Sequence, residues 1–169
     1  RILKTGPSGR FFISSWETET MTETVEDMTI LERTDEYASA LSAGRGCVAH
    51  ICELHRLYEE AVDDGNWKRE EEIRDRILET PYSVQVRSDW CNAYEQITGR
   101  DIAEIKFTLA GGGPAVRLIA KIESYPFEVG EVEIQVQDWF LPWRVLPCGY
   151  NTNKILEWFV HQFPVTECY

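Results

Sequence analysis

The chain lacks the short motifs that mark the commonest enzyme and metal-site classes. It has no GxSxG, HExxH, DxD or CxxC pattern, and its three histidines, His50, His55 and His161, are scattered. Catalysis and metal binding need nucleophile, base and ligands that converge on one point. We therefore expect a protein that is not an enzyme and that holds no metal or other cofactor.

Positive charge is also scarce in this chain. There are 17 Lys and Arg against 29 Asp and Glu, for a formal net charge of −12. Proteins that bind duplex nucleic acid gain affinity by neutralising phosphates with Lys and Arg, so the balance argues against nucleic acid as the direct ligand. It suits a basic protein partner, including an enzyme whose groove normally holds nucleic acid. Ordinary solvation of the surface is the plainer alternative.

The chain has no long apolar run, and its number of cysteines is odd. No stretch approaches 18 apolar residues, no secretory signal is present, and the five cysteines include no close pair. These absences predict free thiols in a reducing bacterial cytoplasm, with no membrane partner. Because the sequence begins with Arg1 rather than Met, we expect its natural start to lie upstream.

Strict alternation of apolar and polar residues organises the middle of the chain. It recurs in four stretches and predicts an antiparallel sheet with one apolar and one polar face: Ser83–Trp90, Glu104–Ala110, Ala115–Glu123 and Glu131–Trp139. A Gly-Gly-Gly-Pro run at 111–114 joins the middle two stretches. A strand and not a helix follows these glycines, so they predict a hairpin turn rather than a phosphate loop.

Apolar residues three and four apart predict helices on both sides of this region. The helices are expected over Cys47–Asp64, Trp67–Glu79 and Asn153–Phe163, with Gly44 and Gly46 breaking any earlier helix. Val62, Trp67 and Leu78 are expected to face inward. The fold class is α+β, a four-stranded antiparallel sheet with a helical hairpin and terminal helices packed on one face. The single domain, 1–169, divides into an N-terminal arm and acidic helical segment (1–45), the hairpin (46–80), the sheet (81–143) and a C-terminal helix (144–169).

Two local patterns resemble a zinc site and a cysteine nucleophile, but the sequence supports neither. Cys47, His50, Cys52 and His55 resemble zinc ligands, but at 100° per residue Cys52 and His50 lie about 160° apart around a helix. We expect His55 to be satisfied near the core instead. Cys91 would be a nucleophile only if a histidine or a helix end reached it.

Charge is segregated between two candidate partner-binding surfaces. The first is a set of acids on the predicted hairpin: Glu59, Glu60, Asp63, Asp64, Glu70, Glu71, Glu72 and Asp75. The second is the polar sheet face, where Arg87 and Arg117 would be anchors with Trp139 and Trp143 at the rim. Solvation of an ordinary sheet face is the competing interpretation of the second set.

Three pieces of the chain, SVQVRSDW, GGGPAVR and QDWFLPW, resemble a family of small proteins of phages and other bacterial mobile elements. The resemblance covers about residues 60–145 and carries over no catalytic residues. It implies a host-takeover or anti-defence protein, with anti-CRISPR inhibitors of RNA-guided nucleases among the candidates.

Together these features predict a non-enzymatic acidic protein that inhibits a nucleic-acid-processing enzyme of the host. Its carboxylates would occupy positions that phosphates normally take. Two alternatives stay open at this point. One is a small hydrolase or nucleic-acid-modifying enzyme that uses the polar sheet face, and the other is a homodimeric structural protein that pairs through an edge strand or its tryptophans.

Overall fold

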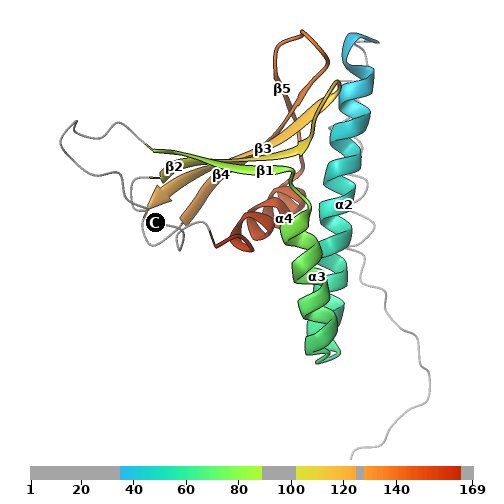
Figure 1. The fold of residues 1–169 in the computed structure, drawn as a ribbon, viewed down its shortest axis with the longest axis vertical. Coiled ribbons are helices and arrows are strands. Elements are labelled where there is room, and N and C mark those ends of the chain that lie inside the picture. Colours follow the sequence, from blue (N-terminus) through green and yellow to red (C-terminus); the bar gives the residue numbers. More distant parts are fainter. Residues whose placement is uncertain (1–34, 89–101, 125–127, 165–169) are drawn as a thin grey trace, which may run out of the picture.

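A computed structural model describes residues 35–88, 102–124 and 128–164 of the chain. Its elements, in chain order, are η2 (Asp35–Tyr37), α2 (Ala38–Asp63), α3 (Trp67–Glu79), β1 (Ser83–Ser88), β2 (Ile102–Ala110), β3 (Ala115–Ser124), β4 (Glu128–Gln137), β5 (Arg144–Leu146) and α4 (Tyr150–His161). Figure 1 shows one sheet with α4 across one face, α2 running past its end and α3 folding back along α2. The α+β class and the antiparallel sheet are confirmed.

The sheet is a meander of five strands in the order β1-β2-β3-β4-β5, with every neighbouring pair antiparallel. The expectation of four strands is therefore wrong. The fifth strand, β5, pairs with β4 through Ile134 opposite Leu146. Strand β5 is only three residues long and lies between Pro142 and Pro147 in the sequence. Three residues are too few for an alternation of apolar and polar side chains to be recognised.

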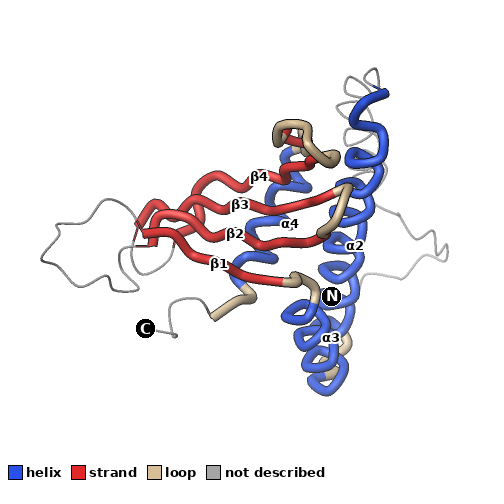
Figure 2. The backbone as a smooth tube through the Cα atoms, turned by 45° about the horizontal axis from the view of Figure 1, so that its top comes forward, coloured by secondary structure: helices blue, strands red, loops and turns tan. Residues whose placement is uncertain are grey.

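The predicted alternation is confirmed in the three central strands. Ile105, Phe107, Leu118, Ile134 and Val136 are buried on the face that α2 and α4 cover. The residues between them point to the opposite face, which the described helices leave open in Figure 2. At the edge strand β1 the pattern weakens, because an edge strand has a neighbour on one side only. Val84, expected inside, is 40% exposed, and Val86 is half-buried.

Helix α2 runs through both glycines that were expected to interrupt it, so that expectation is wrong, and the helix crosses residue 45, where one segment was expected to end. Gly44 is buried against the sheet. A Cβ atom built there would lie 2.6 Å from Val136 Cγ1 and 3.1 Å from Leu146 Cδ2. The absence of a side chain lets the helix backbone approach β4 and β5. This packing stabilises the helix at a residue whose own helix propensity is low.

The structure contains the predicted hairpin of two helices, α2 and α3, although α2 begins at Ala38 rather than at Cys47. Gly65 turns the chain with φ +63°, and the Asn66 side chain accepts a hydrogen bond from the Arg69 backbone N–H at 3.2 Å, which caps α3. Ile73 and Ile77 are buried on the inner face of α3. Trp67 and Leu78, expected to face inward, are 73% and 39% exposed. This correction follows from geometry, since α3 packs along α2 and extends away from the sheet in Figure 1.

The two α2 glycines provide a matched test of this packing. We expect Gly46→Ala, where an added Cβ meets nothing within 4 Å, to raise the free energy of unfolding by about 0.5–1 kcal/mol through helix propensity. Gly44→Ala should lower it by about 1–3 kcal/mol, because Val136 is a stiff, buried neighbour that has to move. Chemical denaturation of both variants measures the difference, and equal effects would contradict the close approach.

Candidate functional site

Acidic side chains gather on the hairpin. Residues 50–80 contain ten Asp and Glu against five Lys and Arg. All eight acids predicted for the partner surface lie there, exposed except for the half-buried Glu70. Figure 1 shows this part of α2 and α3 projecting beyond the sheet and α4. The structure thus presents the predicted acids on one rigid projection.

Three arginines neutralise part of this set. Arg56 pairs with Glu53 at 2.7 Å and also with Glu60. Arg69 lies 3.4 Å from a Glu60 oxygen and 3.9 Å from an Asp64 oxygen, which links the ends of the two helices. These pairs are solvent-exposed, so each contributes little stability, and their main effect is to occupy the carboxylates of Glu60 and Asp64.

Glu70 is engaged in the same way, nearer the centre of the hairpin. It accepts hydrogen bonds from Arg74 at 3.0 Å and from the Tyr58 hydroxyl at 3.1 Å. Arg74 also bonds the Tyr58 oxygen at 3.1 Å. Glu70 therefore joins α3 to α2 and is not available as a free surface charge.

Three of the four remaining acids of α3 form a carboxylate row, which we define as Glu71, Asp75 and Glu79; the fourth, Glu72, is exposed beside the row. The three acids of the row are exposed, recur every four residues, and make no ion pair with any described residue. Four residues advance an α-helix by about 6 Å, so the row sets three like charges at regular intervals on a rigid support. Such i,i+4 repulsion destabilises a helix by about 0.2–0.5 kcal/mol per pair. Glu79 was not among the predicted residues, although its spacing from Asp75 was visible in the sequence.

The base of the hairpin is held by aromatic contacts with α4. The Trp158 ring centroid lies 4.6 Å from that of His55, edge-on, and 5.4 Å from that of Tyr58. Burial lowers the pKa of His55, and the nearby Glu59 carboxylate acts in the opposite direction. His55 is thus a packed, half-buried residue, as expected from the sequence.

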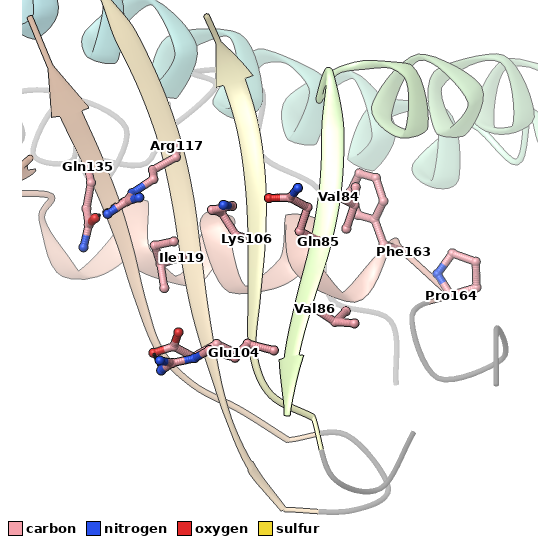
Figure 3. Close-up of a pocket in the computed structure, with 11 residues that line it drawn as sticks. Val84, Gln85, Val86, Glu104, Lys106, Arg117, Ile119, Gln135, Phe163 and Pro164 are labelled. Atoms are coloured by element: carbon pink, nitrogen blue, oxygen red, sulfur yellow. Dashed lines mark hydrogen bonds and ion pairs between the residues drawn. The ribbon is translucent and has the colours of Figure 1, made fainter. Parts of the chain in front are cut away.

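The second candidate surface is the open face of the sheet. Strand pairing sets Thr108, Arg117 and Gln135 side by side in one row, and Gln85, Lys106 and Ile119 in the next. A groove of about 950 Å³ lies over this face and continues around the edge of β1 (Figure 3), and we call it the polar groove. Its lining residues are Val84, Gln85, Val86, Arg87, Glu104, Lys106, Arg117, Ile119, Gln135, Phe163 and Pro164.

Arg117 is the most constrained cation of the polar groove. Its Nε donates to Gln135 Oε1 at 2.9 Å, and its guanidinium carbon lies 4.0 Å from the centre of the Trp143 ring. Burial lowers the pKa of Arg117, while Glu104 opposes that shift. Arg117 and Trp143, predicted separately as an anchor and a rim residue of this surface, are in contact in the structure.

The other two predicted residues of this surface lie differently. Arg87 lines the groove and forms an ion pair with Glu104 at 2.8 Å. Trp139 has a positive φ of 41° and is 67% exposed, beside the 99% exposed Phe140. Its ring covers Gly113, where a Cβ would lie 2.7 Å from a ring carbon, so Trp139 stands at the glycine-rich turn and does not line the groove.

The cysteine and histidine pattern of α2 is not assembled into one site. Cys47 and His50 line a separate cavity of about 270 Å³. Burial raises the pKa of Cys47 and Cys52, and burial together with Cys52 raises that of Cys148 to about 11. These thiols are free and protonated, which is the reverse of an activated nucleophile.

Within residues 35–88, 102–124 and 128–164, no three His, Cys, Asp or Glu side chains converge as metal ligands would. Cys91, the other candidate nucleophile, lies outside the described residues.

Comparison with known proteins adds no assignment, since no family model, curated protein or solved structure matches the chain. Among the helices that the structure describes, none combines the length and the apolar character needed to cross a membrane.

The packing of His55 predicts a pH dependence of stability. A histidine whose pKa is lower in the folded state takes up a proton more readily when unfolded. Its contribution is therefore complete above the unfolded pKa of about 6.5 and is lost as the pH falls below that value. We expect wild-type stability to fall more steeply than that of His55→Gln between pH 7 and pH 5. Denaturation at several pH values measures this, with the exposed His50→Gln as control, and parallel curves for wild type and His55→Gln would contradict it.

Proposed function

We propose that this chain is a non-enzymatic binding protein whose carboxylate row docks on a basic, nucleic-acid-binding groove of a host enzyme. An RNA-guided nuclease is the proposed class of partner, and the consequence of binding is inhibition. The observation that carries the proposal is the projection of the α2–α3 hairpin beyond the sheet, where Glu71, Asp75 and Glu79 form no ion pair with any residue that the structure describes.

Rigidity is what makes this arrangement suitable for replacing phosphates. Charges that match a basic groove have to be held at fixed separations before contact, because ordering a flexible acidic segment would cost free energy on binding. The hairpin meets this need through the Asn66 cap, the Arg69 and Arg74 bridges and the buried pair Ile73 and Ile77. Exposed Trp67 lies one helical turn before Glu71 and adds an aromatic anchor to the same side of α3.

The acidity of the hairpin also suits fast association. A projection with a net negative charge attracts an opposite charge over about a Debye length, which is about 8 Å at physiological ionic strength. Such steering raises the association rate more than it slows dissociation.

Charge reversal of the carboxylate row tests the proposed function. The triple variant Glu71→Lys, Asp75→Lys and Glu79→Lys keeps three like charges at the same spacing, so we expect its stability to change little. Its association rate with a guide-free RNA-guided nuclease should fall about tenfold or more at low salt, and the loss should shrink as salt is raised. Surface plasmon resonance at several salt concentrations measures both effects.

The control triple variant is Glu36→Lys, Glu123→Lys and Glu128→Lys. It changes the net charge equally at exposed positions away from the hairpin. It should retain most of the association rate. If the row variant binds normally while Arg87→Ala or Arg117→Ala loses binding, the partner surface is the open sheet face and not the carboxylate row. Absence of binding to any nuclease tested, with or without guide RNA, would count against the proposal as a whole.

A single substitution separates stability from binding. Asp75→Lys converts two repulsive i,i+4 pairs into attractive ones with Glu71 and Glu79, so the free energy of unfolding should rise by about 1–2 kcal/mol. Partner association should nevertheless slow. A variant that is both more stable and unimpaired in binding would show that the row is not part of the interface.

A further inference from the structure

The polar groove carries two cations that its own carboxylates do not neutralise. Glu104, the carboxylate in its lining, is paired with Arg87 at 2.8 Å. Glu133 lies outside the lining, opposite Ile119, and keeps its charge while it accepts a hydrogen bond from the neutral amide of Gln135 at 2.8 Å. Lys121, also on this face, is paired with Glu131. Lys106 makes no hydrogen bond or ion pair with any described residue. Among the same residues, the one hydrogen-bond partner of Arg117 is the neutral amide of Gln135. Both are partly buried.

These two cations are placed to act together. Lys106 on β2 is paired with Ile119 on β3, and Arg117 stands two residues before Ile119, so the two cations occupy diagonal positions on one face. Diagonal neighbours lie about 7–8 Å apart between backbones, within reach of long side chains. Figure 3 shows both side chains projecting from this face, with Gln85 beside Lys106.

Arg117 is also preorganised for an anion. Its Nε is used by Gln135 and one side of its guanidinium plane faces Trp143, which hold the group in one orientation. Its terminal nitrogens are left to donate, and two parallel donors from a guanidinium match a carboxylate or a phosphate.

An apolar end accompanies the cationic one. Ile119 is the aliphatic member of the open-face row, with Lys106 and then Gln85 next to it across the sheet. Beyond Gln85 the groove reaches Val84, Val86 and Phe163 around β1, so the aliphatic stems of Lys106 and Gln85 lie between Ile119 and this end. Neighbouring strands are 4.7–4.9 Å apart, so this apolar end lies about 10 Å from β3. A groove with one cationic and one apolar end is complementary to a molecule with the same two parts, and its volume of about 950 Å³ is in the range of small-molecule sites.

We propose that the polar groove binds a small amphipathic anion, with its carboxylate or phosphate between Lys106 and Arg117 and its apolar body along Ile119 toward Val86 and Phe163. The site is separate from the carboxylate row in residues and in charge. Its test therefore does not depend on the outcome for the proposed function.

Octanoate, octyl phosphate and the neutral octanamide are the probes, titrated into the full chain and followed by calorimetry and by NMR shifts of tryptophan indole N–H groups. We expect saturable binding of at least one anion and at least tenfold weaker binding of octanamide. Which of the two anions binds more tightly identifies the head group. No saturable binding of either anion, or equal binding of octanamide, overturns the proposal.

Substitutions then locate the site. Lys106→Gln and Arg117→Gln should each weaken anion binding about tenfold, whereas Lys121→Gln, on the same face but outside the groove lining, should leave it unchanged. Thermal melting checks that each variant is folded, and Lys106→Gln decides the question if Arg117→Gln does not fold. Binding that survives Lys106→Gln, or that falls equally in Lys121→Gln, contradicts the assignment.

Discussion

The close contact between α2 and the sheet at Gly44 determines the arrangement of the other elements. Because no side chain separates the helix backbone from Val136 and Leu146, α2 packs directly on β4 and β5. A helix of 26 residues is about 39 Å long, more than is needed to cross the end of the sheet. The remainder extends past α4 and becomes the first arm of the hairpin. The position of the acidic projection is thus a consequence of how one glycine packs.

The same arrangement separates the two candidate sites. The helices cover one face of the sheet, and the hairpin leaves that layer at its end (Figures 1 and 2). The carboxylate row therefore lies on α3, whereas the polar groove is lined mainly by the strands. In a chain of net charge −12, Lys106 and Arg117 form no ion pair with any residue that the structure describes, because Glu104, the carboxylate of the groove, is paired with Arg87. One protein therefore displays an acidic surface suited to a basic partner and a cationic groove suited to a small anion.

Part of each site was predictable from residue types and spacing. The acids of α3 could be predicted to face solvent because the apolar spacing identifies the helix and places its two isoleucines on the inner side. What spacing did not show is which of them are neutralised. Glu70 and Glu71 are adjacent in sequence, yet Glu70 is held by Tyr58 and Arg74 while Glu71 has no ion pair within the described chain. Likewise, Arg117 and Trp143 are 26 positions apart, and their contact depends on the pairing of β3, β4 and β5.

The sequence by itself determined the α+β class, the alternation of β2, β3 and β4, and the helix over Trp67–Glu79, because these depend on periodicities of two and 3.6 residues that each segment carries within itself. Only the tertiary structure decided that Gly44 lies within a helix, that β5 is a strand, and that Trp67 is exposed. In each case contacts with another part of the chain, or their absence, decide the outcome. Gly44 is held in the helix by packing on the sheet, and β5 is a strand because it pairs with β4. Trp67 is exposed because it lies on the part of α3 that extends away from the core. Local patterns report which face of an element is apolar, but only packing determines what, if anything, covers that face.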